Sequence, residues 1–473
     1  MADILITHCN HLHFDRKQVR KMQPYPPLQA ILAAAVLRHA GFEVALFDST
    51  FQDPEAGFAR ALAQHRPKFV FLCEDNFNFL SKMCLTRNRQ LAFFMAGLAR
   101  EAGIPVAAAG SDASDHLVDY LRNGCGYVVM GEVEETIVDL ARHVFTRGTS
   151  RPDRVAGIAW CDADSRIHVN RRRDRIADLD SLPRPAWDLV AMEDYRAAWR
   201  TAHGYFSLNM VSSRGCPYRC NWCAKPIYGS TYQARSPRAI AEELAWLKQV
   251  YRPDRIWFAD DIFALSNQWT LEFAGAVEAL DASLPFKMQS RCDLMTRPTV
   301  AALARAGCAE VWMGAESGSQ KVLDAMDKGL RATQIYSACE NLRAHNIRVC
   351  LFLQFGYPGE GWEEIQETIR LVRKTQPDDI GVSVAYPLPG TRFYQLVESQ
   401  LGPKQNWEDS DDLTMMFQGA YTSEFYRALR DALHLEVNAA GVPNRAVDEA
   451  WQRVEALEKT SAAANPTLLW TCC

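Results

Sequence analysis

Three cysteines set close together carry the most specific chemistry in this chain. Cys216, Cys220 and Cys223 follow the spacing C-x3-C-x2-C. Gly215 and a proline beside the first cysteine favour a tight loop, and the alternating segment Tyr205–Ser212 before it predicts a strand. Three thiolates on such a loop match the ligands of three irons of a [4Fe–4S] cluster, with the fourth iron left open to another ligand.

Two other interpretations of these cysteines are weaker. A structural zinc site takes four protein ligands, usually in paired groups, and no fourth ligand follows at a suitable spacing. A disulfide framework fits less well still, because the other cysteines are scattered singly and have the context of small buried hydrophobic residues.

The cysteine motif resembles that of the radical S-adenosylmethionine (radical SAM) enzymes, which place an aromatic residue, here Trp222, before the last cysteine. The resemblance implies a [4Fe–4S] cluster and SAM as cofactors. It also implies a partial (β/α)6 barrel, and the chain after residue 205 does alternate predicted strands and helices.

Polar residues follow the predicted strands of this barrel, where barrel enzymes place their sites. The resemblance implies that residues at these positions contact SAM: Trp222, Asp260, Asp261, Arg291, Glu316, Ser317, Gln354 and Tyr386. It matches Gly314–Ser319 to a segment that contacts SAM and Asp260–Phe263 to the one that receives the methionyl ammonium. For Asp260 and Glu316 the structural alternative is a helix N-cap.

The first third of the chain alternates short apolar strands with helices, which predicts a doubly wound parallel sheet. No G-x-G-x-x-G opens the first helix, so a dinucleotide-binding fold is not favoured. The layout instead resembles the cobalamin-binding domain that precedes the radical SAM barrel in one large subfamily. The matching segments are Pro26–Ala30, Gly110–Ala113 and Gly131–Thr136.

The resemblance implies a cobalamin site formed by loops after the predicted strands, from Asn76, Gly110, Ser111, Asp112, Gly131, Glu132 and Glu134. The two glycines would admit close backbone approach, or be plain turn glycines. The D-x-H-x-x-G motif is absent, so no histidine of that motif should coordinate cobalt. The resemblance places Asn76 near the lower face of the corrin, and an Asx-turn is the alternative.

The expected fold class is α/β in four parts. Residues 1–145 form a Rossmann-like cobalamin-binding domain, and 146–195 form a hairpin and a proline-rich linker. Residues 196–395 form the radical SAM barrel, and 396–473 form a helical C-terminal region.

Composition limits the function classes. A net charge of −5 gives no general attraction for nucleic acid. The sequence shows no signal peptide and no apolar run of about twenty residues, so no membrane span is expected. Scattered cysteines beside a cluster loop indicate a reducing cytoplasm, and the Cys472–Cys473 pair is expected to be a frayed tail.

The resemblance implies reductive cleavage of SAM to a 5′-deoxyadenosyl radical, which removes a hydrogen atom from a small-molecule or lipid substrate. Methylcobalamin would then methylate the carbon. Three alternatives stay open: cyclisation or rearrangement without methyl transfer, a radical SAM enzyme that has lost cobalamin, and a non-catalytic cobalamin or iron–sulfur sensor. An electron donor such as flavodoxin or ferredoxin is implied, and we expect a monomer.

Overall fold

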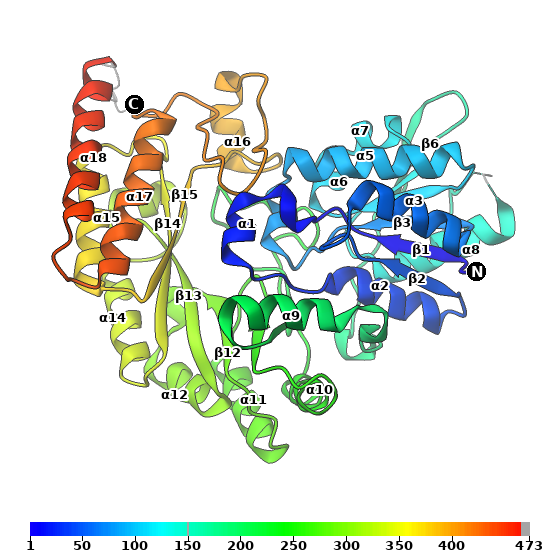
Figure 1. The fold of residues 1–473 in the computed structure, drawn as a ribbon, viewed down its shortest axis with the longest axis horizontal. Coiled ribbons are helices and arrows are strands. Elements are labelled where there is room, and N and C mark those ends of the chain that lie inside the picture. Colours follow the sequence, from blue (N-terminus) through cyan, green and yellow to red (C-terminus); the bar gives the residue numbers. More distant parts are fainter. Residues whose placement is uncertain (149–150, 465–473) are drawn as a thin grey trace.

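The computed structural model describes residues 1–148 and 151–464, and in it two β-sheets lie side by side (Figure 1). The pair Cys472–Cys473 lies outside the described residues. No helix in the described ranges has both the length and the apolar composition needed to cross a membrane.

The first sheet contains seven strands in the order β2-β1-β3-β4-β5-β6-β7. Its first five strands are parallel: β1 (Ile4–Thr7), β2 (Val44–Phe47), β3 (Phe69–Cys73), β4 (Val106–Ala109) and β5 (Tyr127–Val129). The last two are antiparallel: β6 (Ile158–Cys161) and β7 (Ile167–Val169).

Helices cover both faces of this sheet, which confirms the doubly wound prediction. Helices α2 (Leu28–His39) and α8 (Glu134–Arg147) pack on one face. Helices α3 (Pro54–His65), α5 (Thr86–Glu101) and α7 (Leu117–Arg122) pack on the other. The shorter helices are α1 (Arg16–Lys21), α4 (Phe79–Lys82) and α6 (Ser111–Asp115).

The hairpin β6–β7 extends the first sheet, although the sequence analysis grouped it with the linker. Helix α9 (Met192–His203) then crosses the position at which the barrel was expected to begin. We therefore propose that the first domain reaches to the end of β7 and that α9 belongs to the connection.

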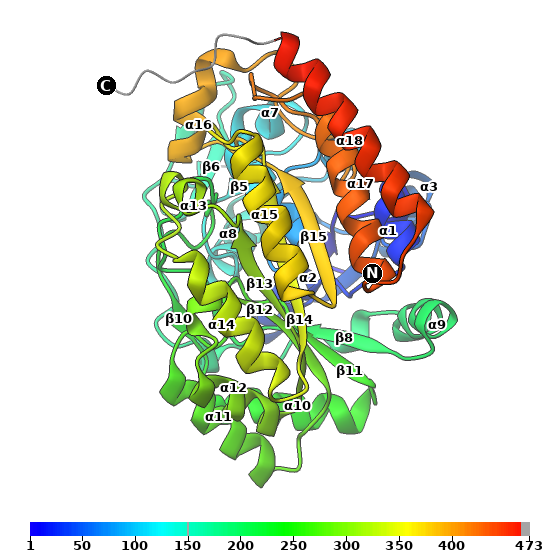
Figure 2. The same cartoon turned by 90° about the vertical axis from the view of Figure 1, so that its left-hand side faces the viewer.

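The second sheet has six parallel strands in the order β15-β14-β13-β12-β11-β8 and forms an open barrel (Figure 2). Its strands are β8 (Ser207–Met210), β11 (Arg255–Phe258), β12 (Phe286–Ser290), β13 (Cys308–Glu316), β14 (Arg348–Phe355) and β15 (Asp379–Val384). A separate ribbon pairs β9 (Ser213–Arg214) with β10 (Gln233–Ala234). This arrangement confirms the predicted partial (β/α)6 barrel.

The barrel helices follow the strands in alternation and cover the outside of the sheet. They are α10 (Pro237–Val250), α11 (Asn267–Ala279), α12 (Arg297–Ala306), α13 (Gln320–Ala325), α14 (Ala332–Arg343) and α15 (Trp362–Thr375). The C-terminal region adds α16 (Arg392–Val397), α17 (Ser423–Ala439) and α18 (Arg445–Ala464), as the helical prediction required.

A buried ion-pair cluster joins the two sheets at Arg214, directly before the cysteine loop. Its guanidinium lies 2.8 Å from Glu132 Oε1 and 2.6 Å from Glu134 Oε1, and all three side chains are buried. Gln29 Nε2 donates to Glu134 Oε1 at 3.0 Å, and the Ile176 N–H donates to Glu132 Oε2 at 2.7 Å. Each of the two carboxylates thus has a hydrogen-bond donor besides Arg214, which helps to satisfy a buried pair.

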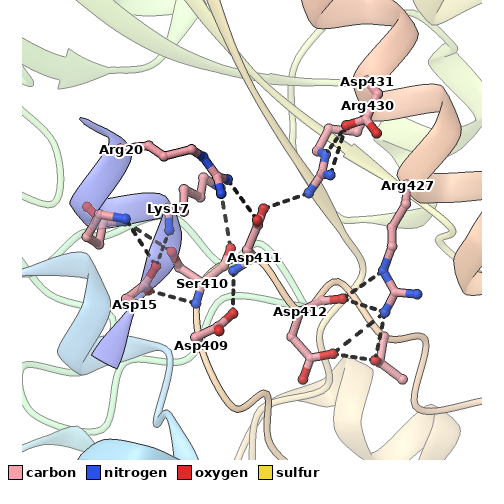
Figure 3. Close-up of polar contacts among 12 residues, drawn as sticks. Asp15, Lys17, Arg20, Asp409, Ser410, Asp411, Asp412, Arg427, Arg430 and Asp431 are labelled. Carbon is pink, nitrogen blue, oxygen red and sulfur yellow. Dashed lines mark hydrogen bonds and ion pairs between the residues drawn. The ribbon is translucent and has the colours of Figure 1, made fainter. Parts of the chain in front are cut away.

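A second junction ties α1 to the C-terminal region (Figure 3). The Ser410 backbone N–H donates to Asp15 Oδ2 at 2.9 Å, while Asp15 Oδ1 caps the first turn of α1. Asp411 lies 2.8 Å from Arg20 of α1 and 2.8 Å from Arg430 of α17. Helix α1 is therefore held against the side of the barrel by Ser410 and Asp411, which follow the last barrel strand in the sequence.

The turn after β14 buries a carboxyl group. Gly356 has φ +75°, and its backbone N–H donates to Glu360 Oε2. Glu360 Oε1 has no hydrogen-bond partner in the structure, and burial raises the pKa of Glu360 to about 8.

Removing the buried guanidinium should destabilise the protein strongly. Arg214→Ala leaves Glu132 and Glu134 buried without their cation, so the free energy of unfolding should fall by about 3–5 kcal/mol. Urea unfolding followed by circular dichroism measures this loss. Arg238→Ala removes an exposed pair with Glu242 and should cost no more than about 0.5 kcal/mol. Equal losses in both variants would contradict the importance of the Arg214 cluster.

Burial of Glu360 predicts a pH dependence of stability. Its folded-state pKa is raised from 4.5 to about 8, so the folded protein holds a proton that the unfolded chain releases in that window. The stabilisation from this group is complete below the window and is lost as the pH rises through it. In urea unfolding, the stability of Glu360→Gln relative to the unmodified chain should increase by about 3–5 kcal/mol as the pH rises from about 5 to about 8.5. The exposed control Glu363→Gln should show no such gain, and a pH-independent Glu360→Gln difference would refute the assignment.

Candidate active site

The cysteine loop leaves β9 at a glycine that no other residue can replace easily. Gly215 has φ +76°, and a Cβ there would lie 2.3 Å from the Thr231 carbonyl oxygen. The three cysteines of the loop are half-buried free thiols. Burial raises the pKa of Cys223 to about 12, so cluster binding would have to displace its proton.

The three thiols are not arranged around one point. In residues 1–148 and 151–464, no group of three His, Cys, Asp or Glu side chains is placed to hold a single metal ion. A [4Fe–4S] cluster takes each cysteine on a different iron, so its ligands stand farther apart than those of a mononuclear site.

Asp260 supports the segment that precedes the cysteines. Its carboxylate is 0% exposed and accepts hydrogen bonds from the Ser212 N–H, the Ser212 hydroxyl and the Ser213 hydroxyl. Burial raises its pKa to about 6. All three of these bonds end at Asp260 Oδ1 and hold the segment that leads into the cysteine loop. A direct contact of Asp260 with SAM stays a prediction.

Arg291 reaches the cysteine loop from the end of β12. Its guanidinium lies 3.7 Å from the centre of the Tyr218 ring, and Nη1 is 3.9 Å from Cys220 Sγ. Asp293 and the Lys328 carbonyl hold the other nitrogens. A fixed positive charge therefore lies beside one cysteine of the loop.

The other predicted SAM contacts divide into two groups. Glu316, Ser317 and Asp261 have protein partners. Glu316 has φ +60° and lies 2.7 Å from Lys328 Nζ, Ser317 Oγ is 3.0 Å from Thr368 Oγ1, and Asp261 pairs with Lys82 of α4. In the second group, Trp222 Nε1 and Gln354 Oε1 are buried with no hydrogen-bond partner.

Trp222 and Gln354 line a cavity of about 590 Å³ inside the open barrel. Glu316 and Gln289 lie on the same wall, and Phe79 and Met83 of the first domain face it. Unpartnered buried polar atoms at a cavity wall indicate groups that a ligand satisfies. The structure thus brings three predicted SAM contacts, Trp222, Glu316 and Gln354, to one cavity.

Tyr386, the last predicted SAM contact, instead links the domains. Its hydroxyl donates to the Met83 carbonyl at 2.9 Å and accepts from Asn406 Nδ2 at 3.0 Å. Its ring stacks on Trp407 with centroids 4.1 Å apart. Any contact of Tyr386 with SAM remains a prediction.

Several predicted cobalamin contacts are engaged with protein groups. A Cβ at Gly110 (φ +135°) would meet the Glu74 side chain at 2.5 Å, so the space that this glycine frees is filled by Glu74. Asp112 pairs with Arg89 and accepts from the Tyr120 hydroxyl at 2.8 Å. Ser111 is buried at the start of α6.

The remaining predicted cobalamin contacts differ among themselves. The carboxylates of Glu132 and Glu134 are both paired with Arg214. A ligand at the loop after β5 would therefore contact groups other than these two carboxylates. Gly131 has φ +80° and no protein atom within 4 Å of its Cβ position. Asn76 is 1% exposed, and neither its Oδ1 nor its Nδ2 has a hydrogen-bond partner. Asn76 and Gly131 therefore fit a bound group best.

Sequence reasoning missed the cations that pair with the predicted acids. Lys82, Arg89 and Lys328 are distant from their partners or lack any local pattern. Only Arg214 carried a usable signal, because it directly precedes the cysteine motif.

One family model and several known proteins are similar to this chain. The Radical SAM superfamily model matches residues 210–372. An uncharacterized methyltransferase of Pyrococcus horikoshii is 25% identical over 316 residues, which cover 63% of this chain and 67% of that protein. The anaerobic magnesium-protoporphyrin IX monomethyl ester cyclase of Synechocystis is 24% identical over 385 residues, covering 79% of this chain and 73% of that one.

Two solved structures share the fold across both sheets. The cobalamin-dependent S-adenosylmethionine radical enzyme OxsB matches with a TM-score of 0.73 at 16% identity, over 98% of this chain and 72% of its own. The radical SAM methyltransferase TsrM of Kitasatospora setae matches with a TM-score of 0.69 at 18% identity, over 84% of this chain and 76% of its own. Residues 210–372 therefore form a radical SAM domain, and the chain shares the fold of OxsB and TsrM across both sheets.

Proposed function

We propose that this protein is a cobalamin-dependent radical SAM methyltransferase that acts on an unactivated carbon of a small-molecule or lipid substrate. The observation that carries the proposal is the position of the large cavity. It lies inside the barrel, receives Trp222 from the cysteine loop, and is faced by Phe79 and Met83 of the cobalamin-type domain. A substrate there would stand between the two regions assigned to the cofactors.

The residues fit the cofactors that this activity needs. Cys216, Cys220 and Cys223 would hold the cluster, while Asn76 and Gly131 offer an unsatisfied amide and an open backbone to cobalamin. When bound, the cluster supplies the electron for reductive SAM cleavage, and cobalamin supplies the methyl group.

The chain itself holds, orients and shields the reactants. Arg291 places a positive charge at Cys220, and Asp260 fixes the strand end that leads into the loop. Gln354 Oε1 and Trp222 Nε1 offer an acceptor and a donor to a ligand in the cavity. Aromatic side chains on the wall exclude water, which protects a reactive carbon from side reactions.

Cyclisation or rearrangement without methyl transfer is the second candidate. The likeness to the Synechocystis cyclase favours it, because that relative spans 79% of this chain. Product analysis separates the two, since only methylation replaces a hydrogen atom with a methyl group and so adds a net CH2 to the substrate.

We also propose an electron-transfer partner such as flavodoxin or ferredoxin, a monomeric state, no nucleic-acid partner, and a reducing cytoplasmic setting. The free thiol state of every described cysteine supports the reducing setting.

The function is tested first by removing the cluster ligands. Replacing Cys216, Cys220 and Cys223 together with Ala should reduce reconstituted iron from about four atoms per chain to a trace and abolish 5′-deoxyadenosine formation. Anaerobic reconstitution with iron and sulfide, iron analysis and chromatography after addition of SAM and reductant provide the measurements. Cys161→Ala, at another half-buried cysteine, is the matched control and should retain both. Persistent SAM cleavage in the triple variant would refute the radical SAM assignment.

Cobalamin retention tests the first domain. Asn76→Leu removes a buried amide that has no protein partner, so the apoprotein should keep its stability or gain about 1–3 kcal/mol. The same variant should lose corrin after reconstitution with hydroxocobalamin and desalting, as absorbance spectra report. Asn123→Leu, at an exposed position, should retain it. A variant that binds corrin normally but is strongly destabilised would assign Asn76 a purely structural role.

A further inference from the structure

One end of the large cavity carries three lysines, Lys17 and Lys21 of α1 and Lys287 of β12. The ammonium groups of Lys17 and Lys287 donate to neutral oxygens, and Lys287 Nζ also lies 5.5 Å from the centre of the Tyr25 ring and 5.7 Å from that of the Trp257 ring. Lys17 Nζ donates to the Ser410 carbonyl at 3.3 Å, and Lys287 Nζ donates to Gln23 Oε1 at 3.3 Å. Across the described ranges, none of the three lysines forms an ion pair.

The carboxylates on the same wall are mostly neutralised by other cations. Glu310 pairs with Arg348 at 2.9 Å, and Glu316 pairs with Lys328 at 2.7 Å. Asp379 alone among the lining acids has no ion pair within the part of the chain that is described, and its Oδ1 accepts the Ile380 N–H. The lysines therefore outnumber the acids available to balance them.

Burial disfavours the charged form of all three lysines. Burial lowers the pKa of Lys17 to about 8, and repulsion by Lys21 adds to the effect. Burial also lowers the pKa of Lys21 and of Lys287, while the nearby carboxylates Asp379 and Glu310 respectively oppose part of that shift. A bound anion would reverse these shifts.

Next to the lysines the wall is aromatic. Tyr25 packs on Trp257 with ring centroids 4.7 Å apart, and Trp312 stacks on Phe352 at 4.8 Å. Phe352 is 36% exposed although it lies in a strand of the barrel. Large rings left uncovered inside a cavity are suited to a flat or apolar ligand surface.

This end of the cavity is remote from the cysteine loop. Lys287 is the second residue of β12, whereas Arg291, which contacts Cys220, directly follows that strand. Four residues of extended chain span about 13 Å. An anionic group at Lys287 is therefore separate from any group held at the cysteines.

We infer that the cavity takes a substrate with a flat apolar body and one anionic group, a carboxylate or a phosphate, which pairs with Lys287 and the lysines of α1. The inference rests on the proposed function and specifies its substrate class. The aromatic wall holds the body, and the lysines fix which end faces away from the cysteine loop. The orientation of the substrate then decides which carbon stands near the reacting groups.

Calorimetric titration of the reconstituted holoenzyme with three probes tests the inference: naphthyl phosphate, naphthoate and the neutral naphthalene-methanol. At least one anion should bind about tenfold or more tightly than the alcohol. Lys287→Gln should abolish that preference without weakening the alcohol, and Lys287→Arg should retain it. Tighter binding of the phosphate indicates a phosphorylated substrate, and tighter binding of naphthoate indicates a carboxylate.

Lys248→Gln, at a lysine outside the cavity, is the matched control and should keep the preference. If Lys287→Gln fails to fold by circular dichroism, the double variant Lys17→Gln and Lys21→Gln takes its place. Equal binding of all three probes, or an unchanged preference in these variants, would overturn the inference. SAM cleavage assayed in the same preparation reports on the proposed function separately, so failure of one is distinguishable from failure of the other.

Discussion

The structure depends on keeping one guanidinium charge buried between two domains. Arg214 is stable in that position only because Glu132 and Glu134 both face it, and each of these carboxylates has a further hydrogen-bond donor. A buried ion pair contributes little net stability, yet removal of one partner is costly. Such a cluster therefore specifies one relative position of the two domains more than it stabilises either domain.

Other polar contacts also join the first domain to the barrel and to the C-terminal region. Lys82 of α4 pairs with Asp261 after β11, and the Tyr386 hydroxyl donates to the Met83 carbonyl. Arg89 bonds both Asp112 of its own domain and Asn406 of the C-terminal region. Polar groups predicted to bind cofactors thus also define the walls within which cofactors would sit.

Local sequence signals were sufficient for much of the fold. Helices α2 and α10 follow such local signals, because a proline stands at the start of each. Helices α1 and α9 were not predicted. Helix α1 is short and polar, and it is held by Ser410 and Asp411, which lie far along the chain.

The candidate site was predictable only where its chemistry is local. The spacing of Cys216, Cys220 and Cys223 identifies the cluster loop, since one loop supplies all three ligands. The partners of Glu134 and Gly110 were not predictable, because Arg214 and Glu74 approach them through tertiary packing. No pattern within a short window encodes such contacts.

The junction between α1 and Asp411 also orders the events of synthesis. The Asp15–Ser410 contact joins residues separated by 395 positions, so the first helix to leave the ribosome is among the last to reach its native neighbours. The cysteine loop is synthesised long before that contact is possible, whereas the last barrel strand, β15, ends at Val384, only shortly before Ser410. Until then, one side of the barrel lacks its covering helix, and the interior stays accessible from that side during translation.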